Sequence, residues 1–339
     1  MGLYNYQGNL MTAKDDVESY FLTELQDTVT KVKALQTEPC LVFCLCTDVH
    51  YASHDTTLFP KTVKNMKAFA EQVRTDGIIC LGDMQDGDST QAVATQRLEA
   101  VMPLLKNSGL PVYFAVGNHE RNTHGSAANM FSISQIYQKT YAYCENEVFS
   151  DMTSNGVNFY KDFDEYKIRM ISLDSVNTDS SSASQYKYPA NTTTWFASAI
   201  SGTPSGYTVL LISHMSPTYT HDWKQTAPLN ASDVLSAIST WLNASNSNKI
   251  ISLCGHNHGD NSYTSPYFEI MFNCNKFDST ITQDKTEDGT GNIPAGSKIW
   301  KRTWGTVTED CWDVVVIRPI SGKVNCVRFG AGEDREFSY

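Results

Sequence analysis

Residues 41–50 read Leu-Val-Phe-Cys-Leu-Cys-Thr-Asp-Val-His, in which the hydrophobic run Leu41–Cys46 leads into an acidic residue and a histidine. Consecutive apolar side chains without polar alternation are typical of a strand that is buried on both faces. In open α/β sheets the residues that follow such strands lie at the carboxyl edge, where ligands bind. Asp48 and His50 are therefore candidate site residues.

Four more hydrophobic runs lead into polar residues that can bind a metal. The runs are Gly77–Leu81, Val112–Val116, Tyr207–Ser213 and Ile250–Cys254, and they lead to Asp83, to Asn118 and His119, to His214, and to His256 and His258. A single polar residue at a strand end is usually a cap or a turn residue. The repetition of this pattern along the chain indicates instead that the strand ends meet in one site.

The ordered motifs resemble those of the calcineurin-like metallophosphoesterase superfamily. They stand here as Asp48-Val49-His50, Gly82-Asp83-Met84-Gln85-Asp86, Gly117-Asn118-His119-Glu120, His214 and Gly255-His256-Asn257-His258. The resemblance spans residues from about 41 to 258. It implies an α/β fold, a four-layer α/β/β/α sandwich of two mixed β-sheets flanked by helices. The segment 328–337 is also similar to the tails of bacterial and phage members.

The resemblance implies a dinuclear metal centre. It assigns Asp48, His50, Asp83 and His258 to the first ion, and Asp83, Asn118, His214 and His256 to the second. Nitrogen and oxygen ligands without a thiolate favour Mn, Fe, Zn or Ni over Ca or Mg, so two divalent or mixed-valence transition metal ions are expected. Two divalent ions and two carboxylates leave a charge of about +2, which a hydroxide and a phosphate oxygen can neutralise.

The resemblance also implies the reaction and its catalytic residues. Phosphate mono- or diesters of a small molecule would be hydrolysed by attack of a hydroxide that bridges the two ions. His119 would protonate or stabilise the leaving oxygen, and Asp86 would orient His119. Three further histidines lie a few residues beyond metal motifs, and each is either a contact of the substrate phosphate or a solvated loop residue; they are His54, His124 and His221.

The chain is expected to form one large domain with an N-terminal extension. Residues 1–37 are predicted to be a helical extension packed on the core, because apolar residues recur there at steps of three and four. Residues 38–339 are predicted to be a single metallophosphoesterase domain. Within it, 126–155 is a candidate helical cap over the site, and 300–339 is expected to contain a strand hairpin.

The pattern of strands and helices predicts how the domain is wound. Helices predicted at 62–74 and 90–106 alternate with the first three hydrophobic runs. Such alternation indicates parallel strands joined by right-handed crossovers. Residues 156–160 and 167–173 are predicted to form a strand pair on the far side of the core.

Composition limits the partners of the protein. The formal net charge of -11 disfavours duplex nucleic acid, whereas a small phosphorylated substrate is compatible with local charge from metals. No stretch approaches the roughly 20 apolar residues of a membrane span, and no signal peptide is apparent, so no membrane association is expected. The nine cysteines are expected to be free thiols in a reducing, cytoplasmic compartment, with disulfides as the alternative.

Two other functions are compatible with the motifs. A non-catalytic scaffold of this fold would typically have lost His119 or a metal ligand, and here every motif residue is present. A nuclease acting on DNA ends requires a basic groove, and the chain has 26 basic residues against 37 acidic ones. A phosphoesterase is therefore the favoured function.

Overall fold

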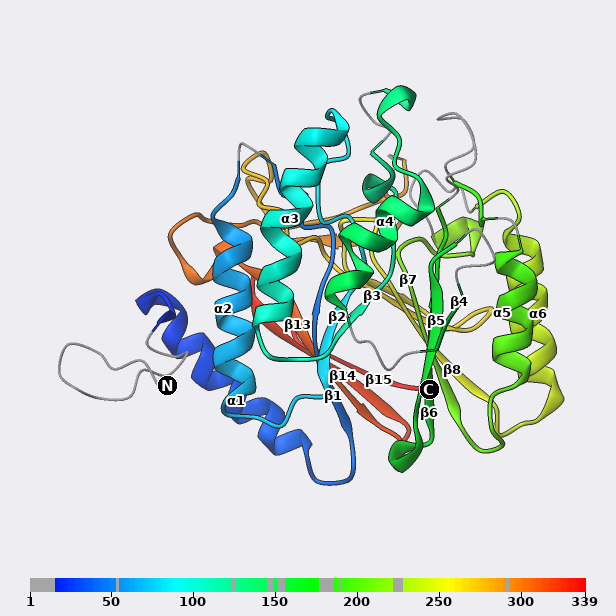
Figure 1. The fold of residues 1–339 in the computed structure, drawn as a ribbon. Helices are drawn as coiled ribbons and strands as arrows, with labels where there is room; N and C mark the ends of the chain where they lie inside the picture. The colour runs from blue at the N-terminus through cyan, green and yellow to red at the C-terminus, as the bar shows by residue number, and fades with distance from the viewer. Residues whose placement is uncertain are drawn as a thin grey trace.

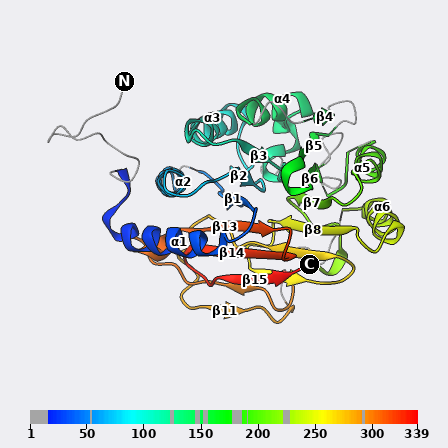
Figure 2. The same ribbon diagram turned by 90° about the horizontal axis from the view of Figure 1, so that it is seen from below.

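The computed structural model describes residues 16–52, 55–122, 126–144, 149–151, 156–176, 186–189, 191–221, 228–290 and 293–339. Two mixed β-sheets pack face to face, and helices flank them on both outer sides (Figure 1). Seen from below, the layers separate clearly (Figure 2). The predicted α/β/β/α sandwich is confirmed.

The first sheet has the strand order β15-β14-β13-β1-β2-β3. Its strands are β1 (Leu41–Cys46), β2 (Gly77–Cys80), β3 (Val112–Phe114), β13 (Cys311–Arg318), β14 (Lys323–Gly330) and β15 (Arg335–Ser338). β1, β2 and β3 run parallel, as the crossover pattern predicts. β13 pairs antiparallel with β1 and forms the predicted hairpin with β14.

The second sheet has the order β4-β5-β6-β7-β8-β10-β9. Its strands are β4 (Phe149–Asp151), β5 (Asn158–Phe163), β6 (Ile168–Leu173), β7 (Thr208–Ser213), β8 (Lys249–Cys254), β9 (Asn261–Tyr263) and β10 (Phe268–Met271). β6, β7, β8 and β10 are parallel. The predicted strand pair is the antiparallel pair β5 and β6. A separate antiparallel pair, β11 (Lys285–Thr286) and β12 (Lys298–Ile299), is joined to the residue before β9 by main-chain hydrogen bonds between Lys298 and Asp260.

The helices are α1 (Leu22–Leu35), α2 (Leu58–Ala70), α3 (Gln91–Asn107), α4 (Ile133–Lys139), α5 (Thr192–Ser201) and α6 (Ala231–Ala244). α1, α2 and α3 lie along the first sheet, and α5 and α6 along the second (Figures 1 and 2). α2 begins four residues earlier than predicted, because Leu58 and Phe59 extend its buried face. Pro60 lies in its first turn, where a missing N–H is tolerated. No helix in the described part of the chain is long and apolar enough to cross a membrane.

The central strand β7 is an almost unbroken hydrophobic run because both of its faces are buried. Leu210 and Ile212 of β7 join the large core that also contains β1 and β13. Val209 and Leu211 of the same strand join a second core, which contains Phe196 of α5 and Trp241 of α6. Successive side chains of a strand point to opposite faces, so one run supplies both cores.

The region of the candidate cap is described only in part. α4 lies beside α3, and Ile136 of α4 is buried (Figure 1). Tyr141 is buried as well, and its hydroxyl donates a hydrogen bond to the main-chain oxygen of Phe114, 2.5 Å away. Residues 145–148 and 152–155 lie outside the described residues. A cap over 126–155 stays a prediction.

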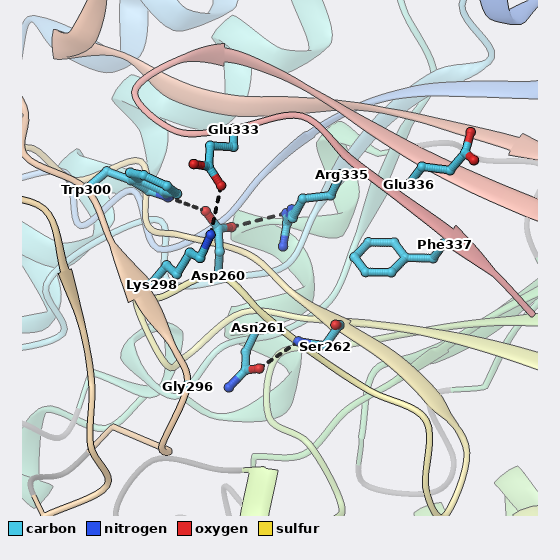
Figure 3. A pocket seen from close by; sticks show the side chains of 10 residues that line it. All are labelled: Asp260, Asn261, Ser262, Gly296, Lys298, Trp300, Glu333, Arg335, Glu336 and Phe337. Carbon is cyan, nitrogen blue, oxygen red and sulfur yellow. Dashed lines mark hydrogen bonds and ion pairs between the residues drawn. The ribbon is translucent and has the colours of Figure 1, made fainter.

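A cavity of about 330 Å³ opens between β9 and β15, the edge strands of the two sheets. Trp300 and Phe337 lie on opposite sides of it (Figure 3). Four of its charged groups pair with one another: Lys298 Nζ lies 2.8 Å from Glu333, and an Arg335 nitrogen lies 3.1 Å from an oxygen of Asp260. The cavity is lined by none of the predicted metal ligands.

Candidate metal centre

The seven predicted metal ligands come together where the carboxyl ends of both sheets meet. β1, β2 and β3 of the first sheet lead to Asp48, His50, Asp83 and Asn118, and β7 and β8 of the second lead to His214, His256 and His258. Three groups of potential ligands form there: Asp48, His50 and His258; His50, Asp83 and His119; and Asp83, His214 and His256. The sequence motifs therefore converge in space.

The main chain turns sharply at the strand ends that carry these residues. Five of the seven have a left-handed φ: Asp48 at 51°, His50 at 49°, Asp83 at 56°, His256 at 66° and His258 at 54°. This conformation costs about 1 kcal/mol or more for a residue with a side chain. Its concentration at one site indicates that the surrounding fold holds these ligands in place.

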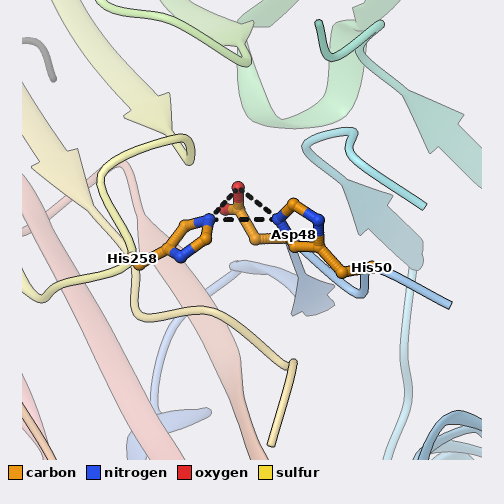
Figure 4. Close-up of side chains that lie close together, drawn as sticks. All are labelled: Asp48, His50 and His258. Atoms are coloured by element: carbon orange, nitrogen blue, oxygen red, sulfur yellow. Dashed lines mark hydrogen bonds and ion pairs between the residues drawn. The ribbon is translucent and has the colours of Figure 1, made fainter. Parts of the chain in front are cut away.

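In the first group, the carboxylate of Asp48 faces ring nitrogens of His50 and His258 (Figure 4). Oδ1 of Asp48 is buried and accepts no hydrogen bond, while Nε2 of His258 lies 3.2 Å from it. Nε2 of His50 lies 3.1 Å from Nε2 of His258 and 4.0 Å from Asp48 Oδ1. A buried acceptor that faces two ring nitrogens is costly without a partner. These residues fit a bound cation.

The second group is held by contacts outside the centre. Nδ1 of His214 lies 2.6 Å from the main-chain oxygen of Leu81, which orients the ring so that Nε2 faces the site. That Nε2 lies 3.0 Å from Asp83 Oδ2 and 3.1 Å from Asn118 Oδ1. Asp83 Oδ2 also lies 4.0 Å from Nε2 of His50. Asp83 thus stands between the two groups, as a bridging ligand would.

His119 lies at the exposed side of the centre. Its ring is 19 % exposed, and its Nε2 lies 3.7 Å from Asp83 Oδ2. Its Nδ1 contacts the main-chain oxygen of Asp86. The carboxylate of Asp86 reaches a different ring, because its Oδ1 lies 3.3 Å from Nδ1 of His50. Asp86 therefore contacts both histidines, through two different groups.

The ionisation states of Asp48, Asp83, His50 and His256 suit metal binding, whereas His214 must lose a proton first. Burial lowers the pKa of His50 to about 4 and that of His256 to about 3, so both rings are neutral at pH 7. Burial raises the pKa of Asp48 and Asp83, but the surrounding histidines together outweigh burial, chiefly His258 beside the first and His119 and His214 beside the second, and both pKa values lie below their usual range. Neutral imidazoles and ionised carboxylates are the forms that bind metals.

A family model described as calcineurin-like phosphoesterase matches residues 41–267. The chain belongs to the calcineurin-like phosphoesterase family. A dimetal phosphatase from Danio rerio shares the fold, with a TM-score of 0.61 and 16% identity over 89% of this chain and 100% of that chain. A 5'-nucleotidase from Candida albicans matches with a TM-score of 0.40 and 13% identity, over 69% of this chain and 45% of that chain. Comparison with curated proteins gave no match.

One residue of this calcineurin-like phosphoesterase has a role that sequence reasoning missed. Glu120 is fully buried, and its carboxylate accepts hydrogen bonds from the main-chain nitrogens of Asp83 and Gly117, each 2.8 Å away, and of Met84, 2.6 Å away. Burial and the nearby charge of Asp83 raise its pKa to about 7. Glu120 joins the loops after β2 and β3. The sequence signal for this role was that Glu120 is the last residue of the Gly117-Asn118-His119-Glu120 motif.

Two motif glycines are required because other groups approach them closely. A Cβ at Gly117 would lie 2.2 Å from Oδ1 of Asp83, and a Cβ at Gly255 would lie 2.0 Å from the hydroxyl of Thr47. Both distances are far inside van der Waals contact. The glycines therefore allow the strand ends to meet at the centre.

Of the three unassigned histidines, only His221 belongs to the described residues; His54 and His124 lie outside them. His221 is buried, its Nδ1 lies 3.0 Å from Glu269, and its ring stacks on Tyr263. Its main-chain oxygen accepts a hydrogen bond of 2.6 Å from the side chain of Asn257, which stands between His256 and His258. His221 is thus neither solvated nor open to substrate. It supports the loop that carries two predicted ligands.

Proposed function

We propose that this member of the calcineurin-like phosphoesterase family is a dinuclear metal-dependent hydrolase of phosphate mono- or diesters. The observation that carries this proposal is the convergence of seven potential ligands at one site, where a buried Asp48 oxygen that accepts no hydrogen bond faces ring nitrogens of His50 and His258. The Danio rerio protein of the same fold is a dimetal phosphatase, and we propose that this chain also binds two metal ions. When bound, the pair supplies positive charge for the phosphate and lowers the pKa of the attacking water.

The proposed ligand sets divide the residues into two groups. The first ion would be held by Asp48, His50, Asp83 and His258, and the second by Asp83, Asn118, His214 and His256. The donor set, all nitrogen and oxygen, favours Mn, Fe, Zn or Ni. His119 is exposed enough to meet a substrate and would donate a proton to the leaving oxygen. Asp86 would hold His119 through its main-chain oxygen.

We propose a small phosphorylated molecule as the substrate. The net charge of -11 opposes long-range attraction of duplex nucleic acid. We further propose a reducing, cytoplasmic location, because all nine cysteines are buried as thiols.

Metal analysis combined with one substitution that removes a negative charge tests this function. Purified protein should contain two transition metal ions per chain, and it should hydrolyse p-nitrophenyl phosphate or bis(p-nitrophenyl) phosphate. A chelator should abolish the activity, and added metal should restore it.

Asp83→Asn should lose metal and activity, because the position between the two groups loses its charge. The matched control is Asp233→Asn on the exposed face of α6. Full metal occupancy in Asp83→Asn, or an inactive metal-loaded wild type, would contradict the proposal.

A further inference from the structure

Lys276 stands beside the metal centre, beyond the residues that the family model matches. Its main-chain nitrogen donates a hydrogen bond of 3.0 Å to the main-chain oxygen of Asp48, and the preceding Asn275 donates one of 2.8 Å to Thr47. Its main-chain oxygen accepts a hydrogen bond of 2.6 Å from the buried guanidinium of Arg302. The main chain of Lys276 is therefore fixed against the strand end that carries a predicted ligand.

The side chain of Lys276 reaches the rim of the centre. Its Nζ lies 3.6 Å from Oδ1 of Asp86, and that oxygen lies 3.3 Å from Nδ1 of His50. Charged hydrogen bonds between nitrogen and oxygen are about 2.7–2.9 Å long, so this ammonium group is attracted to Asp86 without being bonded to it. The Lys276 side chain is 32% exposed, and a solute can reach it.

We propose that Lys276 is a specificity-determining residue that binds the substrate phosphate and selects monoesters over diesters. This inference rests on the proposed function. A monoester at pH 8 carries about two negative charges and three terminal oxygens, whereas a diester carries one charge and two terminal oxygens. Two terminal oxygens suffice for a metal pair. The third oxygen of a monoester needs another cationic partner, and Lys276 offers one at the rim.

A purely structural role makes a different prediction. If Lys276 only balanced the negative charge of Asp86, removing the lysine charge would disturb His50 through the Asp86 carboxylate. Metal binding would then weaken. Both substrate types would then lose activity together. Metal content and the ratio of the two activities therefore separate the two roles.

The test compares Lys276→Ala, Lys276→Arg and the control Lys249→Ala. Lys249 is exposed at the opposite end of β8 from His256, and its removal changes the net charge equally. kcat/KM is measured at pH 8 for p-nitrophenyl phosphate and for bis(p-nitrophenyl) phosphate. Calorimetry on the metal-loaded protein measures the binding of phenylphosphonate, a dianion, and of its monomethyl ester, a monoanion. Elemental analysis gives the metal content of each variant.

Lys276→Ala should keep both metals and lose about 10- to 100-fold in kcat/KM on the monoester, with at most about a threefold loss on the diester. Phenylphosphonate should bind to Lys276→Ala more weakly than to the wild type by a similar factor, and its monomethyl ester should bind equally well to both. Lys276→Arg should retain most of the preference, and Lys249→Ala should match the wild type. Equal losses on both substrates, or a loss of metal in Lys276→Ala, would overturn the assignment. A metal-loaded wild type that hydrolyses neither substrate would instead contradict the proposed function, and the phosphonate titrations would still decide the role of Lys276.

Discussion

Oδ1 of Asp86 lies 3.3 Å from Nδ1 of His50, while the main-chain oxygen of the same aspartate contacts Nδ1 of His119. The resemblance alone predicts that Asp86 orients His119. The structure adds a contact to His50, a predicted ligand of the first ion. A carboxylate behind a ligating imidazole fixes the orientation of the ring and strengthens its metal bond.

Asp86→Asn should weaken metal binding more than it impairs proton donation by His119. The substitution keeps the main-chain oxygen that contacts His119 and removes the charge behind His50. We expect metal affinity to fall about 10- to 100-fold, with similar losses on aryl and alkyl esters at limiting metal. Metal titrations followed by assays at saturating metal measure both effects. A variant with normal metal affinity and a selective defect on alkyl esters would show that the side chain acts through His119.

His119→Ala should keep both metals and lose about 10²- to 10⁴-fold in turnover, because His119 would protonate the leaving oxygen. The loss should depend on the leaving group. A phenolate of low pKa needs little protonation, whereas an alkoxide needs much. The defect should therefore be smaller on aryl phosphates than on alkyl phosphates, as turnover assays on both would show. Equal defects on both ester types would rule out the role as an acid.

Glu120→Gln should destabilise the fold. A glutamine has a single acceptor oxygen, so its amide nitrogen would face at least one main-chain N–H group that now bonds to the carboxylate. We expect the free energy of unfolding, measured in urea, to fall by about 2–4 kcal/mol. The control is Glu165→Gln at an exposed site, where we expect a change of at most about 0.5 kcal/mol. Equal stability of the two variants would contradict the role of Glu120 in joining the loops.

Metal binding should release protons from His214. Burial favours the neutral ring, but Asp83 outweighs burial and raises the pKa of His214 to about 10 in the metal-free protein. This raised pKa stabilises the metal-free fold fully below the ordinary pKa of 6.5, and that contribution is lost as the pH rises through about 10. His50 and His256, with pKa values of about 4 and about 3, have no proton to release at pH 7.

Apparent metal affinity should therefore rise with pH between about 6 and 9, by about tenfold per unit for each proton released. Calorimetric titrations with Mn²⁺ at pH 7 in buffers of different ionisation enthalpy measure the number of protons. At least one proton per chain is expected. Heats that do not depend on the buffer would show that His214 is already neutral.

Local sequence patterns predicted most of the fold. The runs that became β1 and β7 were placed within one residue of their bounds, because a strand buried on both faces requires an unbroken apolar run. The start of α2 was misplaced, because Leu58 and Phe59 adjoin a loop and showed no helical period of their own. The cap over 126–155 remains a prediction.

The sequence by itself determined the fold class and the candidate ligands. Each ligand follows a strand closely, and the apolar residues of that strand are enough to predict that it is buried. Only the tertiary structure decided the neighbours of those ligands. The main chain of Lys276 is hydrogen-bonded to that of Asp48, and the carboxylate of Asp86 contacts the ring of His50. Glu120 joins the loops after β2 and β3. These contacts depend on how two sheets pack and how their loops turn, which no local period of hydrophobic residues encodes.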